Sequence, residues 1–126
     1  MKTSSSILIL LVAILHIYFL VLEMFLWNHP IGYKTFATTP EFATASATLA
    51  MNQGLYNGFL AAGLIYGLLK NNLSFKVFFL GCIIVAGIFG ALTAKLSILF
   101  IQAAPAVLAL ILVLLADNYA SENGHQ

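Results

Sequence analysis

The chain has 126 residues, of which 62% are hydrophobic and only 7% are charged, and its mean hydropathy is +1.02. Soluble domains carry about 25% charged residues because charge keeps a folded surface in water, so this composition excludes an ordinary soluble globular protein. A net charge of +1, without a run of Lys or Arg, also provides no basic surface for nucleic acid. We therefore expect a single all-α membrane domain over residues 1–126, with the lipid bilayer as its partner.

The first predicted span covers residues 7–27, an apolar stretch whose only ionisable groups are His16 and Glu23. As a helix this stretch is about 31 Å long at ~1.5 Å per residue, which matches the hydrocarbon core of a bilayer. It is longer than the core of a signal peptide and is not followed by a small-residue cleavage site. The stretch is therefore interpreted as a retained span.

A polar loop is predicted over residues 28–47. Pro30, Gly32 and Pro40 exclude a continuous helix here, because proline lacks a backbone donor and collides with the preceding turn. Thr39 is placed to cap a short helix that begins at Pro40 and continues towards the second span. The loop is the longest polar stretch of the chain.

Three further spans are predicted, over residues 48–69, 77–93 and 96–116, followed by a short polar and frayed tail over 117–126. The apolar run 77–116 is about twice the length that one span needs, so it must turn once, where Thr93, Lys95 and Ser97 interrupt it. Four spans with short connections predict a compact antiparallel bundle of four transmembrane helices. Small residues four apart, such as Gly54 and Gly58, predict faces at which these helices approach closely.

The lysines give a weak orientation signal. With the amino terminus inside the cell, Lys2, Lys70 and Lys76 are cytoplasmic, whereas Lys34 and Lys95 are outside. Cytoplasmic loops carry the excess of basic residues, so three against two favours both termini in the cytoplasm.

Glu23 is the strongest indication of a functional site. A charged carboxylate in a span costs on the order of 2.5 kcal/mol or more, so it needs a partner, a proton or a water-filled cavity. His16 lies on the same face about 10.5 Å away along the axis, too far for a direct bond, and Trp27 lies one turn beyond Glu23. Further candidates at the depth of Glu23 are the donors at the start of the second span: Asn52, Gln53, Tyr56 and Asn57.

The alternative is that these polar groups only fix helix packing, since such bonds contribute roughly 0.6 kcal/mol each between membrane helices. In the fourth span Gln102, beside Pro105, either shapes a cavity or serves packing alone. No metal site is expected, because His29 and His16 are nearly 20 Å apart on a continuous helix. The residues identify no cofactor.

Several segments resemble a bacterial family of small integral membrane proteins known as domain of unknown function thirteen hundred and four. The resemblance covers nearly the whole chain and is carried by HIYFLVLEMFLWNHP, NQGLYNGFLAAGL, CIIVAGIFGA and IQAAPA. It implies a multi-pass protein of the bacterial inner membrane and leaves the mechanism open.

Three functions follow from these observations. The leading hypothesis is a permease for a small molecule or an ion, working as a homo-oligomer, in which Glu23 exchanges a proton or binds a cation. A membrane-embedded enzyme acting on a lipid or quinone would instead use Glu23 or His16 as its acid or base. In a structural or accessory subunit, the polar cluster would only hold the helices together.

Overall fold

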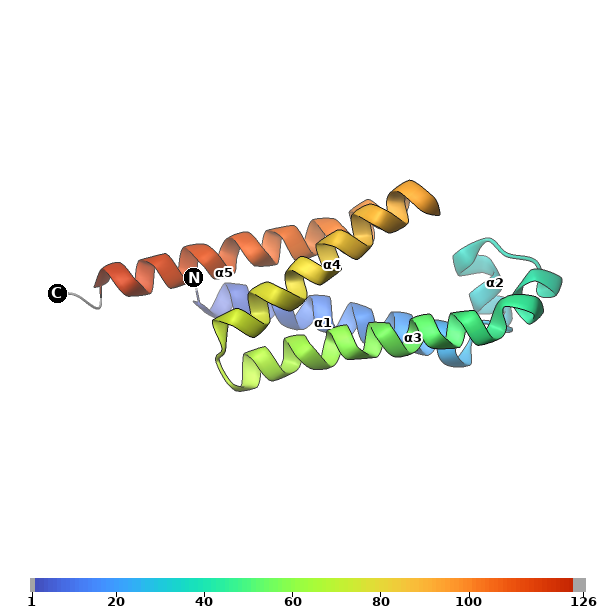
Figure 1. Cartoon of the computed structure of the whole chain (residues 1–126), viewed down its shortest axis with the longest axis horizontal. Helices are drawn as coiled ribbons and strands as arrows, with labels where there is room; N and C mark the ends of the chain where they lie inside the picture. The colour runs from blue at the N-terminus through green and yellow to red at the C-terminus, as the bar shows by residue number, and fades with distance from the viewer. Residues whose placement is uncertain (1, 124–126) are drawn as a thin grey trace. The chain divides into compact units, whose positions relative to one another are not determined.

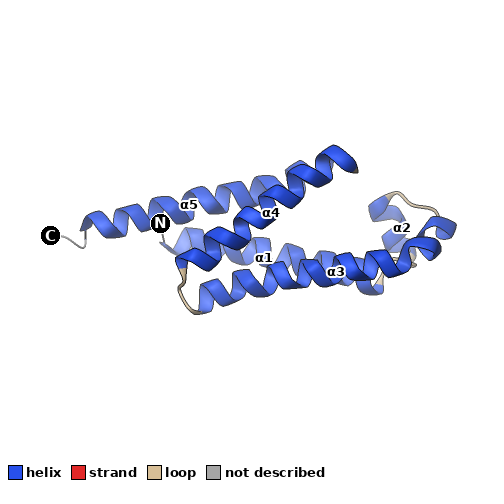
Figure 2. Cartoon of the chain, in the orientation of Figure 1, coloured by secondary structure: helices blue, strands red, loops and turns tan. Residues whose placement is uncertain are grey.

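The computed structural model describes residues 2–123, and nearly all of them are helical (Figures 1 and 2). No strand occurs in this described part of the chain. The elements, in chain order, are α1 (Lys2–Phe25), α2 (Pro30–Phe36), α3 (Pro40–Leu69), α4 (Leu73–Thr93), the π-helical η1 (Leu99–Ala103) and α5 (Ala104–Asn123). The all-α prediction is confirmed.

The stretch expected to be a polar loop, residues 28–47, instead contains the helix α2 and the first two turns of α3. The side chain of His29 accepts a bond from the amide of Ile31, and Pro30 stands at a first-turn position where its missing N–H costs nothing. Ala37 then ends α2 in a left-handed conformation, with φ at 53°. Pro30 therefore starts a helix, whereas the sequence pattern predicted a helix start only at Pro40.

The helix α3 begins as expected, at Pro40. The hydroxyl oxygen of Thr39 accepts a bond of 3.2 Å from the amide of Phe42, which confirms Thr39 as the N-terminal cap. The carboxylate of Glu41 receives hydrogen bonds from its own backbone amide and from the Thr39 hydroxyl, and these bonds hold the pKa of Glu41 below its usual range. The helix then continues without a break to Leu69.

The carboxyl-terminal half of the chain turns where the sequence predicts, between Thr93 and Leu99. The helix α4 begins before the predicted third span, at Leu73, and α5 extends beyond the predicted end of the fourth span, to Asn123. The polar stretch from residue 117 to 123 is thus helical rather than a frayed tail. Residues 124–126 of that tail lie outside the described part.

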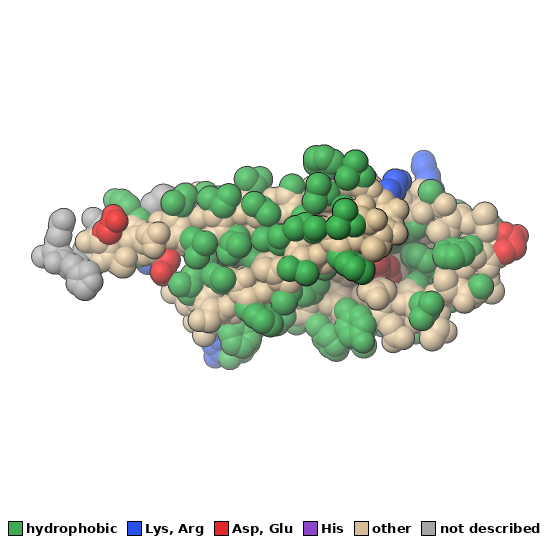
Figure 3. All heavy atoms as spheres, turned by 45° about the horizontal axis from the view of Figure 1, so that its top comes forward, with side chains coloured by type: hydrophobic (Ala, Val, Ile, Leu, Met, Phe, Trp, Pro, Cys, Tyr) green, Lys and Arg blue, Asp and Glu red, His purple; other side chains and the backbone are tan. Residues whose placement is uncertain are grey.

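Three helical stretches are long and apolar enough to cross a membrane: Lys2–Phe25, Leu73–Thr93 and Leu99–Glu122. The 30-residue α3 is not among them, because Asn52, Gln53 and Asn57 lower its hydropathy. Hydrophobic side chains cover much of the face seen in Figure 3, with few charges between them. Leu69 and Leu92 are 79% and 81% exposed, so no protein surface covers them as it would in a soluble core.

The described residues form two compact units, one of residues 2–13 and 62–123 and the other of residues 14–61. Because α1 and α3 are continuous helices, each contributes residues to both units. The single domain expected over residues 1–126 stays a prediction.

Within the first unit, α4 packs closely on the helix that follows it. A Cβ atom on Gly87 would lie 2.9 Å from the backbone nitrogen of Ala103, so only glycine permits this approach. Pro105 follows directly and has no N–H for the carbonyl of Ile101, which accounts for the widened π-helical turn of η1 at this point.

Candidate functional site

The candidate site lies in the second unit, where α1 and α3 pack against each other through two glycines. A Cβ atom on Gly54 would lie 2.6 Å from Cγ of Met24 and 3.1 Å from the carbonyl oxygen of Leu20. A Cβ atom on Gly58 would lie 2.6 Å from Cδ1 of Leu20. The two glycines are four residues apart and thus share one face, so the expectation of a close approach at this pair is confirmed.

This approach brings Asn57 to Glu23. Nδ2 of Asn57 donates a hydrogen bond of 2.7 Å to Oε2 of Glu23, and both side chains are half-buried. The short distance is typical of a bond to a charged acceptor. Asn57 lies three residues after Gly54 and directly before Gly58. Its side chain is therefore at the edge of the contact face, which is the face of α3 that packs against α1. Asn57 is among the partners that the sequence predicts for Glu23, and the structure brings the two together.

The other candidates on α3 are not bonded to Glu23. Successive residues of a helix are ~100° apart, so Asn52 and Tyr56 lie on the face opposite Gly54, and Gln53 lies on its flank. All three side chains are exposed, Tyr56 to 56%. The ring of Tyr56 meets Phe59 at 6.1 Å, edge to face. The sequence predicted the level of these donors along the helix, and the structure shows that only Asn57 of the four lies on the face that reaches Glu23.

His16 is fully buried, with 0% of its surface exposed. Its ring packs edge to face against Phe19, with the ring centroids 5.7 Å apart. The two helical turns between His16 and Glu23 keep their side chains apart, as the spacing predicts. The structure thus gives His16 a packed position inside the unit and does not bring it to the carboxylate.

Trp27 connects the end of α1 to α2 and α3. Its Nε1–H donates a bond of 3.1 Å to Oγ of Ser46, and its ring lies 4.8 Å from the ring of Phe36. Ser46 in turn donates to the carbonyl oxygen of Phe42. The sequence does not predict this role of Ser46, because one serine in a polar stretch carries no signal of its own.

Gln102 belongs to the other compact unit, where it is a half-buried residue of η1. The sequence associated a cavity with Pro105 and Gln102, and the structure shows a π-helical turn there. Turns of this kind are frequent at functional sites, and they also occur where proline disturbs the bonding of a helix. Among residues 2–123, no three His, Cys, Asp or Glu side chains gather closely enough to hold a metal ion.

The pair formed by Glu23 and Asn57 can perform simple ion chemistry. A carboxylate offers about four lone-pair positions, and Asn57 occupies one of them. The remaining positions can accept a proton, a cation or the N–H and O–H groups of a small molecule.

Comparison with known proteins identifies the family. The family described as "Protein of unknown function (DUF1304)" matches residues 10–114, which include every candidate site residue. The chain belongs to this family. It is also similar to the uncharacterized protein YpaA of Lactococcus lactis subsp. lactis (strain IL1403), with 35% identity over 115 residues, covering 88% of this chain and 97% of YpaA. No solved structure matches the chain.

Proposed function

We propose that this member of the family is a four-span protein of the bacterial cell membrane that transports a small molecule or an ion, with Glu23 and Asn57 at its site. The observation that carries the proposal is the bond between these two side chains, one from each of two closely packed helices. An ionisable side chain in a membrane span is expensive and is therefore retained mainly where it acts.

One end of the first unit supports four spans. Lys2 at the start of α1, Asn71 after α3, Lys76 in the first turn of α4 and Asp117 near the end of α5 line a common cavity. The start of α1 and the end of α5 therefore lie on one side, which requires an even number of crossings. If α1, α4 and α5 each cross the bilayer, α3 must cross it too, although its hydropathy is lower. With Lys2, Lys70 and Lys76 at this end, the positive-inside rule favours the cytoplasm for both termini.

The exposed polar groups of α3 favour an aqueous path or a second copy of the chain. Asn52, Gln53 and Tyr56 lie near the middle of a helix that spans about 45 Å at ~1.5 Å per residue. An amide in hydrocarbon without a partner costs several kcal/mol, so these groups must meet water or protein. A homo-oligomer with the exposed face of α3 at its centre satisfies them and provides the walls that four helices alone do not supply.

The test uses the full chain reconstituted into liposomes that contain a pH-sensitive dye. A potassium gradient with valinomycin drives proton entry, and parallel runs without valinomycin follow the uptake of radioactive sodium or rubidium instead. We expect ion flux above that of empty liposomes, with at least a tenfold loss in Glu23→Gln, because the amide keeps hydrogen bonding but cannot carry charge. Glu41→Gln is the matched control, since Glu41 is also a glutamate of the second unit and is exposed at the start of α3.

Equal flux through wild type and Glu23→Gln would contradict the proposal. That result, in a variant that folds, would favour the structural or accessory role, in which the pair only joins α1 to α3. A purified protein that retains a lipid or quinone between α1 and α3 would favour the enzyme hypothesis.

A further inference from the structure

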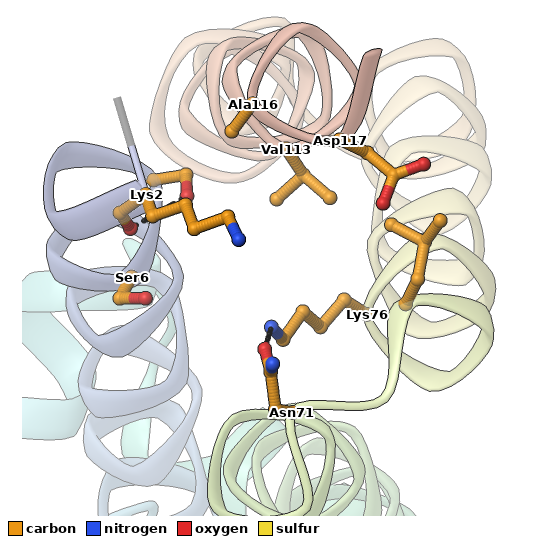
Figure 4. Close-up of a pocket in the computed structure, with 9 residues that line it drawn as sticks. Lys2, Ser6, Asn71, Lys76, Val113, Ala116 and Asp117 are labelled. Carbon is orange, nitrogen blue, oxygen red and sulfur yellow. Dashed lines mark hydrogen bonds between the residues drawn. The ribbon is translucent and has the colours of Figure 1, made fainter. Parts of the chain in front are cut away.

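The polar cavity lined by Lys2, Asn71, Lys76 and Asp117 has a volume of about 110 Å³ and belongs to the first unit, whereas Glu23 and Asn57 belong to the second. Its walls come from the start of α1, the turn between α3 and α4, the first turn of α4 and the last part of α5 (Figure 4). The volume is several times the ~30 Å³ that one water molecule occupies in the liquid. The cavity is thus large enough to hold a small polar group.

Two lysines provide the dominant charge. In Figure 4 the side chains of Lys2, from α1, and Lys76, from α4, extend into the same space. Asp117 of α5 is the only carboxylate among the described lining residues, so two positive charges and one negative charge leave a net charge of +1. No ion pair within residues 2–123 joins either lysine to Asp117. The cavity therefore keeps a net positive charge.

The turn between α3 and α4 positions one of these lysines. Asn71 adopts a left-handed conformation, with φ at 46°, which asparagine tolerates better than most residues. Its Oδ1 atom accepts a bond of 2.9 Å from Nζ of Lys76. Asn72 meanwhile caps α4 by accepting from the amide of Phe75 at 3.0 Å. This geometry fixes the ammonium group and leaves two of its N–H donors, and the amide N–H₂ of Asn71, for a ligand.

Hydroxyl and apolar groups complete the lining. Ser6 lies one turn from Lys2 on α1 and adds an O–H donor, whereas Val113 and Ala116 form an apolar wall from α5. Ammonium, amide and hydroxyl donors around a net positive charge match the oxygens of a phosphate group. An apolar wall beside them suits a ligand that also has a carbon chain.

We propose that this cavity binds a phosphate group that carries a single negative charge, as in the phosphodiester of a phospholipid headgroup or in the monoanion of inorganic phosphate. The cavity lies at the ends of helices that are long enough to cross a bilayer, which is the level of the headgroups. The proposal does not depend on transport through Glu23, which belongs to the other unit.

The experiment uses the delipidated full chain in a maltoside detergent, with binding followed by native mass spectrometry. The probes are dioleoyl phosphatidylglycerol, dioleoylglycerol, which has the same acyl chains without phosphate, and inorganic phosphate. Lys2→Ala/Lys76→Ala removes both ammonium groups. Lys70→Ala is the matched control, because Lys70 lies in the same turn as Asn71 and does not line the cavity.

We expect phosphatidylglycerol binding to weaken about tenfold or more in the double variant and less than about twofold in Lys70→Ala. Asp117→Asn should tighten binding, since it removes the one negative charge. It also tests the site independently if the double variant does not fold. Displacement of the lipid by millimolar phosphate would identify free phosphate as a ligand, whereas no displacement would identify the headgroup. Equal losses in the double variant and Lys70→Ala, or equal binding of dioleoylglycerol, would overturn the proposal.

Discussion

Asn57 Nδ2 lies 2.7 Å from Glu23 Oε2, and this bond joins the one acidic residue of α1 to the middle of α3. The contact exists because Gly54 and Gly58 let the two helices approach more closely than any larger residue would. The two glycines therefore set the distance between α1 and α3, and the side-chain amide of Asn57 supplies the hydrogen-bond donor. The close helix contact and the hydrogen bond between Asn57 and Glu23 therefore lie at the same level of α1 and α3.

Asn57→Ala should destabilise the protein by about 1 kcal/mol, because Glu23 then loses its donor while remaining half-buried. The free energy of unfolding in detergent micelles measures the effect. Asn118→Ala is the control, since Asn118 is an exposed residue of α5, and it should change the free energy by less than about 0.5 kcal/mol. Equal effects of the two substitutions would show that the bond contributes nothing.

Gly32→Ala should lower the free energy of unfolding by roughly 1–3 kcal/mol. Gly32 is buried, and an added Cβ would collide with the carbonyl oxygens of Leu26 and Trp27, which cannot rotate away as a side chain can. Gly81→Ala is the matched control in α4, because no described atom lies within 4 Å of the added Cβ. It should stabilise the helix by up to ~1 kcal/mol. A tolerated alanine at position 32 would contradict the packing of α2 on the end of α1.

Trp27→Phe and Ser46→Ala should each destabilise the protein, and their effects should not add. Both remove the 3.1 Å bond between Trp27 Nε1 and Ser46 Oγ, whereas the phenyl ring retains most of the packing on Phe36. A double-mutant cycle should give a coupling energy of about 0.5–1 kcal/mol. Thermal unfolding of the four proteins measures it. Strictly additive effects would mean that the bond is not made in solution.

Glu41 should contribute stability at neutral pH that is lost in acid. Its folded-state pKa is lowered, chiefly by the bond from its own backbone amide and then by the bond from Thr39. A lowered pKa stabilises the fold above the unfolded-state pKa, and this contribution disappears as the pH falls through the folded-state pKa. The difference in unfolding temperature between wild type and Glu41→Gln should therefore shrink as the pH falls from about 7 to about 3. A constant difference in unfolding temperature over that range would contradict this contribution of Glu41.

The sequence by itself determined the class of the protein and the level of its candidate site. A chain with low charge and long apolar runs must form helices that satisfy their own backbone hydrogen bonds, because lipid offers no other donors or acceptors. The spacing of Gly54 and Gly58 predicts a close helix contact, and the polar residues beside them predict a partner for Glu23. Thr39 and Pro40 likewise predict the start of α3, since capping is a local interaction.

Only the tertiary structure decided which of the four donors on α3 reaches Glu23. The rotation of α3 about its axis turns Asn57 towards α1 and leaves Asn52 and Tyr56 exposed, and this rotation depends on packing at Gly54 and Gly58 rather than on local preference. The cavity between Lys2 and Lys76 was equally invisible in the sequence, because 74 positions separate them and they converge only when the start of α1 meets the turn before α4. Local patterns fix the helices, whereas contacts between distant residues fix which faces meet.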